Sequence, residues 1–90
     1  MPQQNQPTVP GEISLKELIE YTAKALVDFP EKVEVVAMES QSSVILELKV
    51  APEDVGKVIG KGGQTAKAMR KILSAAATKL HKKSLLQIIE

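Results

Sequence analysis

Apolar residues begin to recur every three or four positions at Ser14, which predicts an amphipathic helix. Its apolar stripe consists of Leu15, Leu18, Ile19, Thr22, Leu26 and Phe29. Ser14 and Glu17 have capping-box spacing, in which each side chain satisfies a backbone N–H group of the other residue. Pro30 disfavours helical backbone in the residue before it, so we expect the helix to end near Asp28. Tyr21 and Phe29 lie on or near the stripe, and we expect both in the core.

Three segments have the pattern of β-strands. Residues 33–39 are rich in valine. In residues 44–50, apolar side chains at every second position alternate with Ile45, Glu47 and Lys49, the period of a half-buried strand. Ser40-Gln41-Ser42 predicts a short hairpin connection between them. The short, apolar and partly β-branched segment 85–89 predicts a third strand at the end of the chain.

Two more helices are predicted between the second and third strands. The first begins at Pro52, a residue that suits the first helical turn, and Glu53 and Asp54 complement its dipole. Its apolar face consists of Val55, Val58 and Ile59. The second runs from about residue 64 to residue 82, and its apolar stripe consists of Ala66, Met69, Leu73, Ala76 and Leu80. Its polar, mostly basic face consists of Lys67, Lys71, Ser74, Thr78 and Lys82, with Arg70 beside them.

The predicted order of elements is therefore α-β-β-α-α-β. We expect one α+β domain, in which three helices cover one face of a three-stranded mixed sheet. Residues 1–12 are rich in proline and glutamine and poor in apolar side chains, so we expect a flexible N-terminal tail and a folded domain over residues 13–90.

Charge is distributed unevenly along a chain whose formal net charge is only +1. Residues 1–54 carry four lysines against ten acidic residues, a net charge of −6, whereas residues 55–90 carry seven lysines and one arginine against Glu90, a net charge of +7. A basic second half favours a polyanionic partner, although a solvated charged face explains the same numbers.

Composition excludes several classes of function. The chain has no cysteine and a single histidine, so neither a zinc site nor a cysteine nucleophile can be assembled, and we expect no catalytic residue, metal or cofactor. No apolar run approaches the about 20 residues of a membrane helix, and the N-terminus lacks a signal-peptide pattern. We therefore expect a soluble cytoplasmic protein without enzymatic activity.

The most informative segment is the glycine loop, Gly60-Lys61-Gly62-Gly63, between the two later helices. Glycines let a sugar–phosphate backbone approach closely, Lys61 adds a positive charge, and the next helix presents its positive N-terminal end. A nucleoside-triphosphate loop requires glycine at position 55 and serine or threonine at position 62, which are Val55 and Gly62. A dinucleotide fingerprint requires glycine where Thr65 stands and a strand before the loop.

Val58-Ile59-Gly60-Lys61-Gly62-Gly63 resembles the GxxG loop of KH domains, which clamps about four nucleotides. The element order is similar to the type II, bacterial form of that fold. The chain length, the opening helix and residues 50–61 resemble the KhpA family of small bacterial proteins with a single KH domain, and the likeness covers about residues 13–90. The chain departs from many KH domains at Ala66, where an isoleucine is common and would make a larger apolar contact.

The resemblance implies an RNA chaperone that binds single-stranded RNA and acts in cell-envelope and cell-shape control, including peptidoglycan homeostasis. It implies pairing as a homodimer or with a second KH-containing RNA-binding protein. The RNA-binding residues expected are Gly60, Lys61, Gly62 and Gly63 in the loop, Val58 and Ile59 beside the bases, and Lys57, Gln64, Lys67 and Arg70 on a basic rim.

Two other classes of function stay open from the residues. Two helices around a short turn are also found in helix-turn-helix proteins that bind duplex DNA. A domain of this size can instead be a dimerisation module, in which the glycines serve only as a helix cap and turn.

Overall fold

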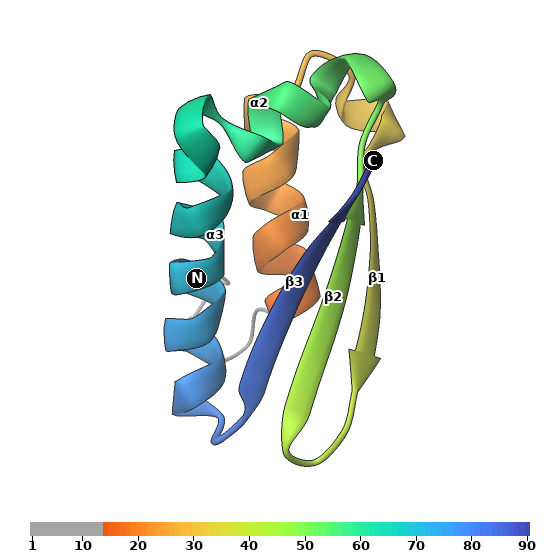
Figure 1. The fold of residues 1–90 in the computed structure, drawn as a ribbon. Coiled ribbons are helices and arrows are strands. Elements are labelled where there is room, and N and C mark those ends of the chain that lie inside the picture. Colours follow the sequence, from red (N-terminus) through yellow and green to blue (C-terminus); the bar gives the residue numbers. More distant parts are fainter. Residues whose placement is uncertain (1–13) are drawn as a thin grey trace, which may run out of the picture.

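The computed structural model describes residues 14–90, and the predicted N-terminal tail of residues 1–12 lies outside the described residues. The elements follow one another as α1 (Leu15–Leu26), β1 (Glu34–Glu39), β2 (Ser43–Lys49), α2 (Val55–Ile59), α3 (Gln64–Lys79) and β3 (Lys83–Ile89). Figure 1 shows the helices on one side of the sheet. This arrangement confirms the predicted fold class and element order.

The strands form one mixed sheet in the order β1-β2-β3. β2 pairs antiparallel with β1 through the short hairpin, and parallel with β3. A parallel pair needs a long crossover connection, and α2 and α3 supply it. The crossover carries the chain along the helical layer, so the glycine loop lies at one end of that layer and the hairpin lies at the other end of the sheet (Figure 1).

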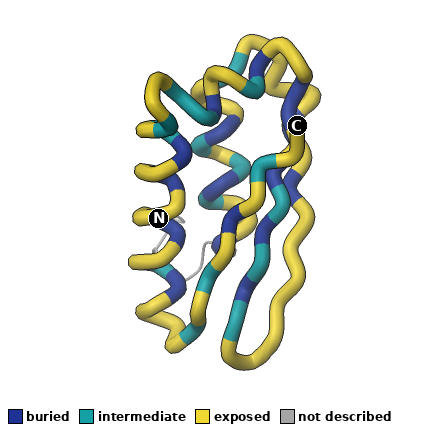
Figure 2. Tube along the Cα trace, in the orientation of Figure 1, coloured by how far each residue is buried: buried dark blue, intermediate teal, exposed yellow. Residues whose placement is uncertain are grey.

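The core lies between the helices and the sheet, as the band of buried positions in Figure 2 shows. Alternate residues of the strands face the helices, which is the period expected of a sheet covered on one side. The buried strand residues are Val35, Val44, Leu46, Leu48 and Leu86. The helices contribute Leu15, Ile19, Ala23, Val58, Met69, Leu73 and Ala77. The intervening strand positions leave Val36, Met38, Leu85 and Ile89 exposed.

The start of α1 is as predicted, but its end is not. Ser14 Oγ accepts the Glu17 N–H at 3.0 Å, and Glu17 Oε1 accepts the Ser14 N–H at 3.1 Å, which is a complete capping box. The helix ends at Leu26, before the expected Asp28, because Val27 is extended. The prediction that Tyr21 and Phe29 are core residues was wrong, since they are 78% and 40% exposed.

α3 ends at Lys79, three residues earlier than predicted. The N–H of Lys82 donates to Ala77 O and the N–H of His81 donates to Thr78 O, both at 2.9 Å, which is the bond pattern of a Schellman motif. His81 takes the left-handed conformation that the motif requires, with φ +60°. The predicted stripe therefore fails in its last turn, where Ala77 is buried and Leu80 is exposed.

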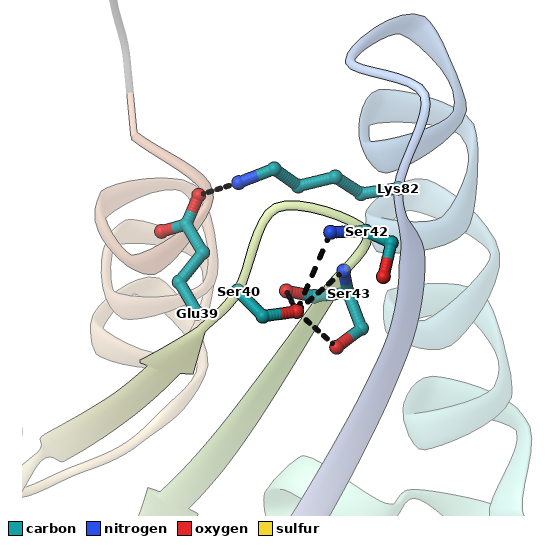
Figure 3. A network of polar contacts seen from close by, with 5 residues as sticks. All are labelled: Glu39, Ser40, Ser42, Ser43 and Lys82. Atoms are coloured by element: carbon teal, nitrogen blue, oxygen red, sulfur yellow. Dashed lines mark hydrogen bonds and ion pairs between the residues drawn. The ribbon is translucent and has the colours of Figure 1, made fainter.

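Polar contacts stabilise the end of the sheet opposite the glycine loop, where the hairpin meets the beginning of β3 (Figure 3). Ser40 Oγ accepts the N–H groups of Ser42 and Ser43 at 3.4 and 3.1 Å. Lys82 Nζ lies 2.5 Å from Glu39 Oε2, so this lysine does not extend the basic face of α3 as predicted. Within residues 14–90, no helix is long and apolar enough to cross a membrane.

Candidate nucleic-acid interface

α2 brings the chain into the glycine loop and packs on the core through Val58, with the partly buried Val55 beside it. Val58 is fully buried in the core, whereas Ile59, the next residue, is only half-buried. The Gly60 N–H donates to Gly56 O at 2.8 Å and closes the end of the helix. Sequence alone does not distinguish the two apolar residues, and the structure leaves only Ile59 near the surface.

Gly60 makes the turn out of α2, with φ +79° and ψ 168°, a region that is essentially restricted to glycine. A Cβ atom at this position would lie 2.2 Å from Thr65 Oγ1 and 2.8 Å from the Thr65 backbone nitrogen. Since these distances are far below van der Waals contact, the second residue of α3 packs directly against the bare α-carbon of Gly60. The loop is folded back onto the start of α3.

Gly62 and Gly63 are glycines for a different reason. Their φ values are +63° and +77°, and a Cβ atom on either one would meet no other atom within 4 Å. Backbone is therefore uncovered on the outer side of the loop, where a ligand can approach it without meeting a side chain. The turn is closed internally, because the Gly63 N–H donates to Gly60 O at 3.0 Å.

The loop leads directly into the N-terminus of α3, a helix of 16 residues. Gly63 is its N-cap and provides no side-chain cap for the first N–H groups of the helix. These groups and the helix dipole make the end of α3 electropositive, and Lys61 is exposed beside it. The predicted loop residues are thus brought together into one positively charged end of the helical layer.

The predicted rim residues Gln64, Lys67 and Arg70 are exposed on α3. Arg70 Nε donates to Leu86 O at 3.3 Å, which places this guanidinium between α3 and β3. Within residues 14–90, Lys61, Lys67 and Arg70 have no carboxylate within ion-pair distance. Their charges are consequently available to an anion at this end of the helical layer.

Lys57 differs from the other predicted rim residues because carboxylates already surround it. Its Nζ lies 3.3 Å from Asp28 Oδ2 and 3.7 Å from Asp54 Oδ1. Asp28 is exposed and Asp54 is fully buried. Any phosphate that binds Lys57 must therefore share it with two acidic side chains.

Sequence reasoning missed the role of Asp54, which it treated as an acid that complements the α2 dipole. The carboxylate instead accepts the N–H groups of Asp28 and Phe29, at 3.2 and 3.0 Å. Its partners are backbone groups about 25 residues away in the chain. Because every residue except proline carries the same N–H group, the sequence contains no signal that could have identified them.

A family model for the KH domain of KhpA/KhpB matches residues 16–88. A protein named RNA-binding protein KhpA from Clostridium perfringens is 56% identical over 75 residues, which are 83% of this chain and 100% of that protein. A protein of the same name from Clostridium acetobutylicum is 53% identical over 75 residues, with the same coverage. Another from Aquifex aeolicus is 47% identical over 77 residues, 86% of this chain and 98% of that protein.

Two solved structures of Era share the fold. One is an Aquifex aeolicus Era variant bound to GDP·AlF4⁻, with a TM-score of 0.62 and 18% identity over 98% of this chain. The other is Era with MgGDPNP and nucleotides 1506–1542 of 16S ribosomal RNA, with a TM-score of 0.63 and 18% identity over 96% of this chain. The chain spans 35% of the length of each Era chain, and at this identity the likeness concerns the fold alone.

The family match covers most of the chain, and the relatives are about half identical over nearly their whole length. The chain belongs to the KhpA/KhpB family of KH-domain proteins.

Proposed function

We propose that this protein binds single-stranded RNA through the glycine loop. The main observation behind this proposal is the uncovered backbone of Gly62 and Gly63 beside Lys61, at the electropositive start of α3. The names of the KhpA relatives support RNA as the partner. The exposed Lys67 and Arg70 add a basic surface that continues from the loop.

In this proposal the loop holds the RNA backbone, and the side of α3 that faces β3 receives the bases. A phosphate lies against Gly62 and Gly63, and Lys61 supplies its countercharge. The half-buried Ile59 offers the bases an apolar contact, while Val58 and Ala66 anchor the two helices from within the core. Arg70 lies at the edge of β3, where it can contact a base or a phosphate.

The test is a double substitution, Lys61→Asp with Gly62→Asp, which places two carboxylates where the phosphate would lie. Single-stranded RNA binding is measured by fluorescence anisotropy, with circular dichroism to establish folding. The matched control is Lys24→Asp with Ala25→Asp on the exposed side of α1, which changes the net charge equally. Loss of binding in the loop variant alone supports the proposal, and unchanged affinity in a folded loop variant refutes it.

Duplex DNA is the competing nucleic acid. α2 has five residues and is followed by three glycines with positive φ, which leaves little rigid helix on that side of the turn. Competition of labelled single-stranded RNA with unlabelled duplex DNA separates the two ligands. Displacement of the RNA by duplex DNA at equal concentration would favour binding of duplex DNA in the manner of a helix-turn-helix protein.

We further propose that the protein is a cytoplasmic RNA chaperone without enzymatic activity, and that it acts in cell-envelope and cell-shape control. The assay is the annealing rate of two complementary RNA strands with the unsubstituted chain and with the loop variant.

Pairing with a second copy, or with another KH protein, is supported by large apolar side chains left exposed. They include Val36, Met38, Leu85 and Ile89 on the sheet, and Tyr21, Ile72 and Leu80 on or beside the helices. The molecular mass in solution of Met38→Lys and of Ile72→Lys, measured by light scattering, tests whether the sheet or the helical layer forms the interface.

A further inference from the structure

Asp54 is a fully buried charged side chain, and both of its oxygens are engaged. Oδ1 accepts the Asp28 N–H at 3.2 Å, and Oδ2 accepts the Phe29 N–H at 3.0 Å. Lys57 Nζ lies 3.7 Å from Oδ1 and supplies a countercharge from the surface. A buried carboxylate is costly unless it is hydrogen-bonded and paired, and this one satisfies both conditions.

The hydrogen-bond partners of Asp54 differ from those expected at its position in the chain. It is the N-cap residue of α2, yet its side chain makes no capping bond to that helix. An aspartate at an N-cap normally accepts an N–H group of its own first turn. Here the carboxylate turns away from α2 and binds the connector of residues 27–29, which follows α1.

The two ends of this contact belong to different parts of the fold. The connector is continuous with α1, a helix anchored in the core by Ile19 and Ala23. Asp54 immediately precedes α2, and the glycine loop begins six residues later at Gly60. The carboxylate therefore fixes the base of the loop-bearing helix to the end of α1.

α2 needs such a fixed point because it has only five residues. A helix this short has no stability of its own, since nucleation costs more than one turn of hydrogen bonds returns. Val58 holds its buried side, and Asp54 with Lys57 holds its first turn. Val58 and the partly buried Val55 pack α2 on the core without a hydrogen bond, so without the Asp54 contact the first turn could shift and the base of the loop would shift with it.

We propose that Asp54 is a positioning residue for RNA binding, which clamps α2 to the connector and so sets the place of the glycine loop. This inference rests on the proposed function for its RNA readout. Asp54 itself contacts no RNA, because its carboxylate is buried and its oxygens are occupied. Lys57 completes the clamp by neutralising the carboxylate, and the exposed Asp28 holds the lysine from the other side.

The principal variant is Asp54→Asn, which keeps the size of the side chain but has a single acceptor oxygen for two N–H groups. The control is Val44→Ala, which removes buried volume near the hairpin, at the opposite end of the sheet from the loop. RNA affinity is measured by anisotropy at a temperature where unfolding curves show both variants folded. We expect Asp54→Asn to weaken binding about tenfold, and Val44→Ala to leave it unchanged.

Two further readouts separate positioning from a loss of overall stability. The dependence of log affinity on log salt keeps its slope in Asp54→Asn, because no phosphate contact is removed. In the absence of RNA, amide exchange of Gly60 and Gly63 becomes about tenfold faster in Asp54→Asn than in Val44→Ala. Lys57→Met, which leaves both backbone bonds in place, provides a folded comparison, and its loop amides should accelerate less.

Equal loop exchange in Asp54→Asn and Val44→Ala would overturn the clamp, as would equal RNA affinity of Asp54→Asn and the unsubstituted chain. Failure of the unsubstituted chain to bind RNA would overturn the proposed function alone, because amide exchange reports on the clamp without RNA.

Discussion

Thr65 Oγ1 lies 2.2 Å from the position that a Cβ atom on Gly60 would occupy. Gly60→Ala therefore forces a methyl group into the side chain and backbone nitrogen of Thr65, at a backbone conformation that only glycine readily adopts. We expect this variant to lower the free energy of unfolding by at least about 2 kcal/mol, as measured by urea denaturation. The loop should also lose its RNA affinity in the fraction that remains folded.

Gly56→Ala is the matched control for this substitution. Gly56 lies inside α2 with an ordinary helical backbone, and a Cβ atom there would meet nothing within 4 Å. Alanine in a helix is preferred to glycine by about 0.5–1 kcal/mol, so this variant should be slightly more stable than the parent. Comparable losses in the two variants would contradict the close contact between Gly60 and Thr65.

The charge of Lys61 predicts a specific change in salt dependence. If Lys61 neutralises one phosphate, Lys61→Ala should reduce the magnitude of the slope of log affinity against log salt by about 0.7, the value for one contact to a single strand. A titration of RNA binding across several salt concentrations measures the slope. Lys24→Ala, on the exposed side of α1, should leave it unchanged. Equal slopes in the parent and Lys61→Ala would show that this lysine contacts no phosphate.

His81 predicts a gain in stability rather than a loss. It holds φ at +60° in the Schellman motif that ends α3, a conformation that costs a residue with a side chain about 1–2 kcal/mol. His81→Gly should therefore raise the free energy of unfolding by about 1 kcal/mol. Thermal or urea denaturation measures the change.

Ala75→Gly in the exposed middle of α3 is the control and should lower the free energy of unfolding by about 1 kcal/mol. A destabilised His81→Gly variant would mean that the imidazole makes a contribution larger than the backbone cost.

The elements and the glycine loop could be predicted because their causes are local. The capping box at Ser14 and the period of residues 44–50 depend on neighbours in the chain, and both are found in the structure. The loop was predicted from three glycines and one lysine in register with two helices. Its two kinds of glycine, one packed and two open, could not be distinguished because the difference depends on Thr65 folding back.

The errors have causes that lie outside the local pattern. The end of α1 was placed too late because the N–H groups of Asp28 and Phe29 are accepted by Asp54 and not by the preceding turn. Tyr21 was expected in the core because it lies near the apolar stripe of the first helix, but the buried face of α1 is narrower and leaves this side chain 78% exposed. The end of α3 was missed because histidine is an unusual residue for the left-handed position of a Schellman motif.

The contact between Asp54 and the connector also bears on the order of folding. α1 and the β1–β2 hairpin depend on neighbours in sequence, but the carboxylate reaches Phe29, 25 positions earlier in the chain, only after the segment between them has been closed into a loop. The last attachment of α2 therefore closes a loop that contains the whole β1–β2 hairpin. A nascent chain that has not yet completed β2 contains α1 without the fixed point on which the glycine loop depends.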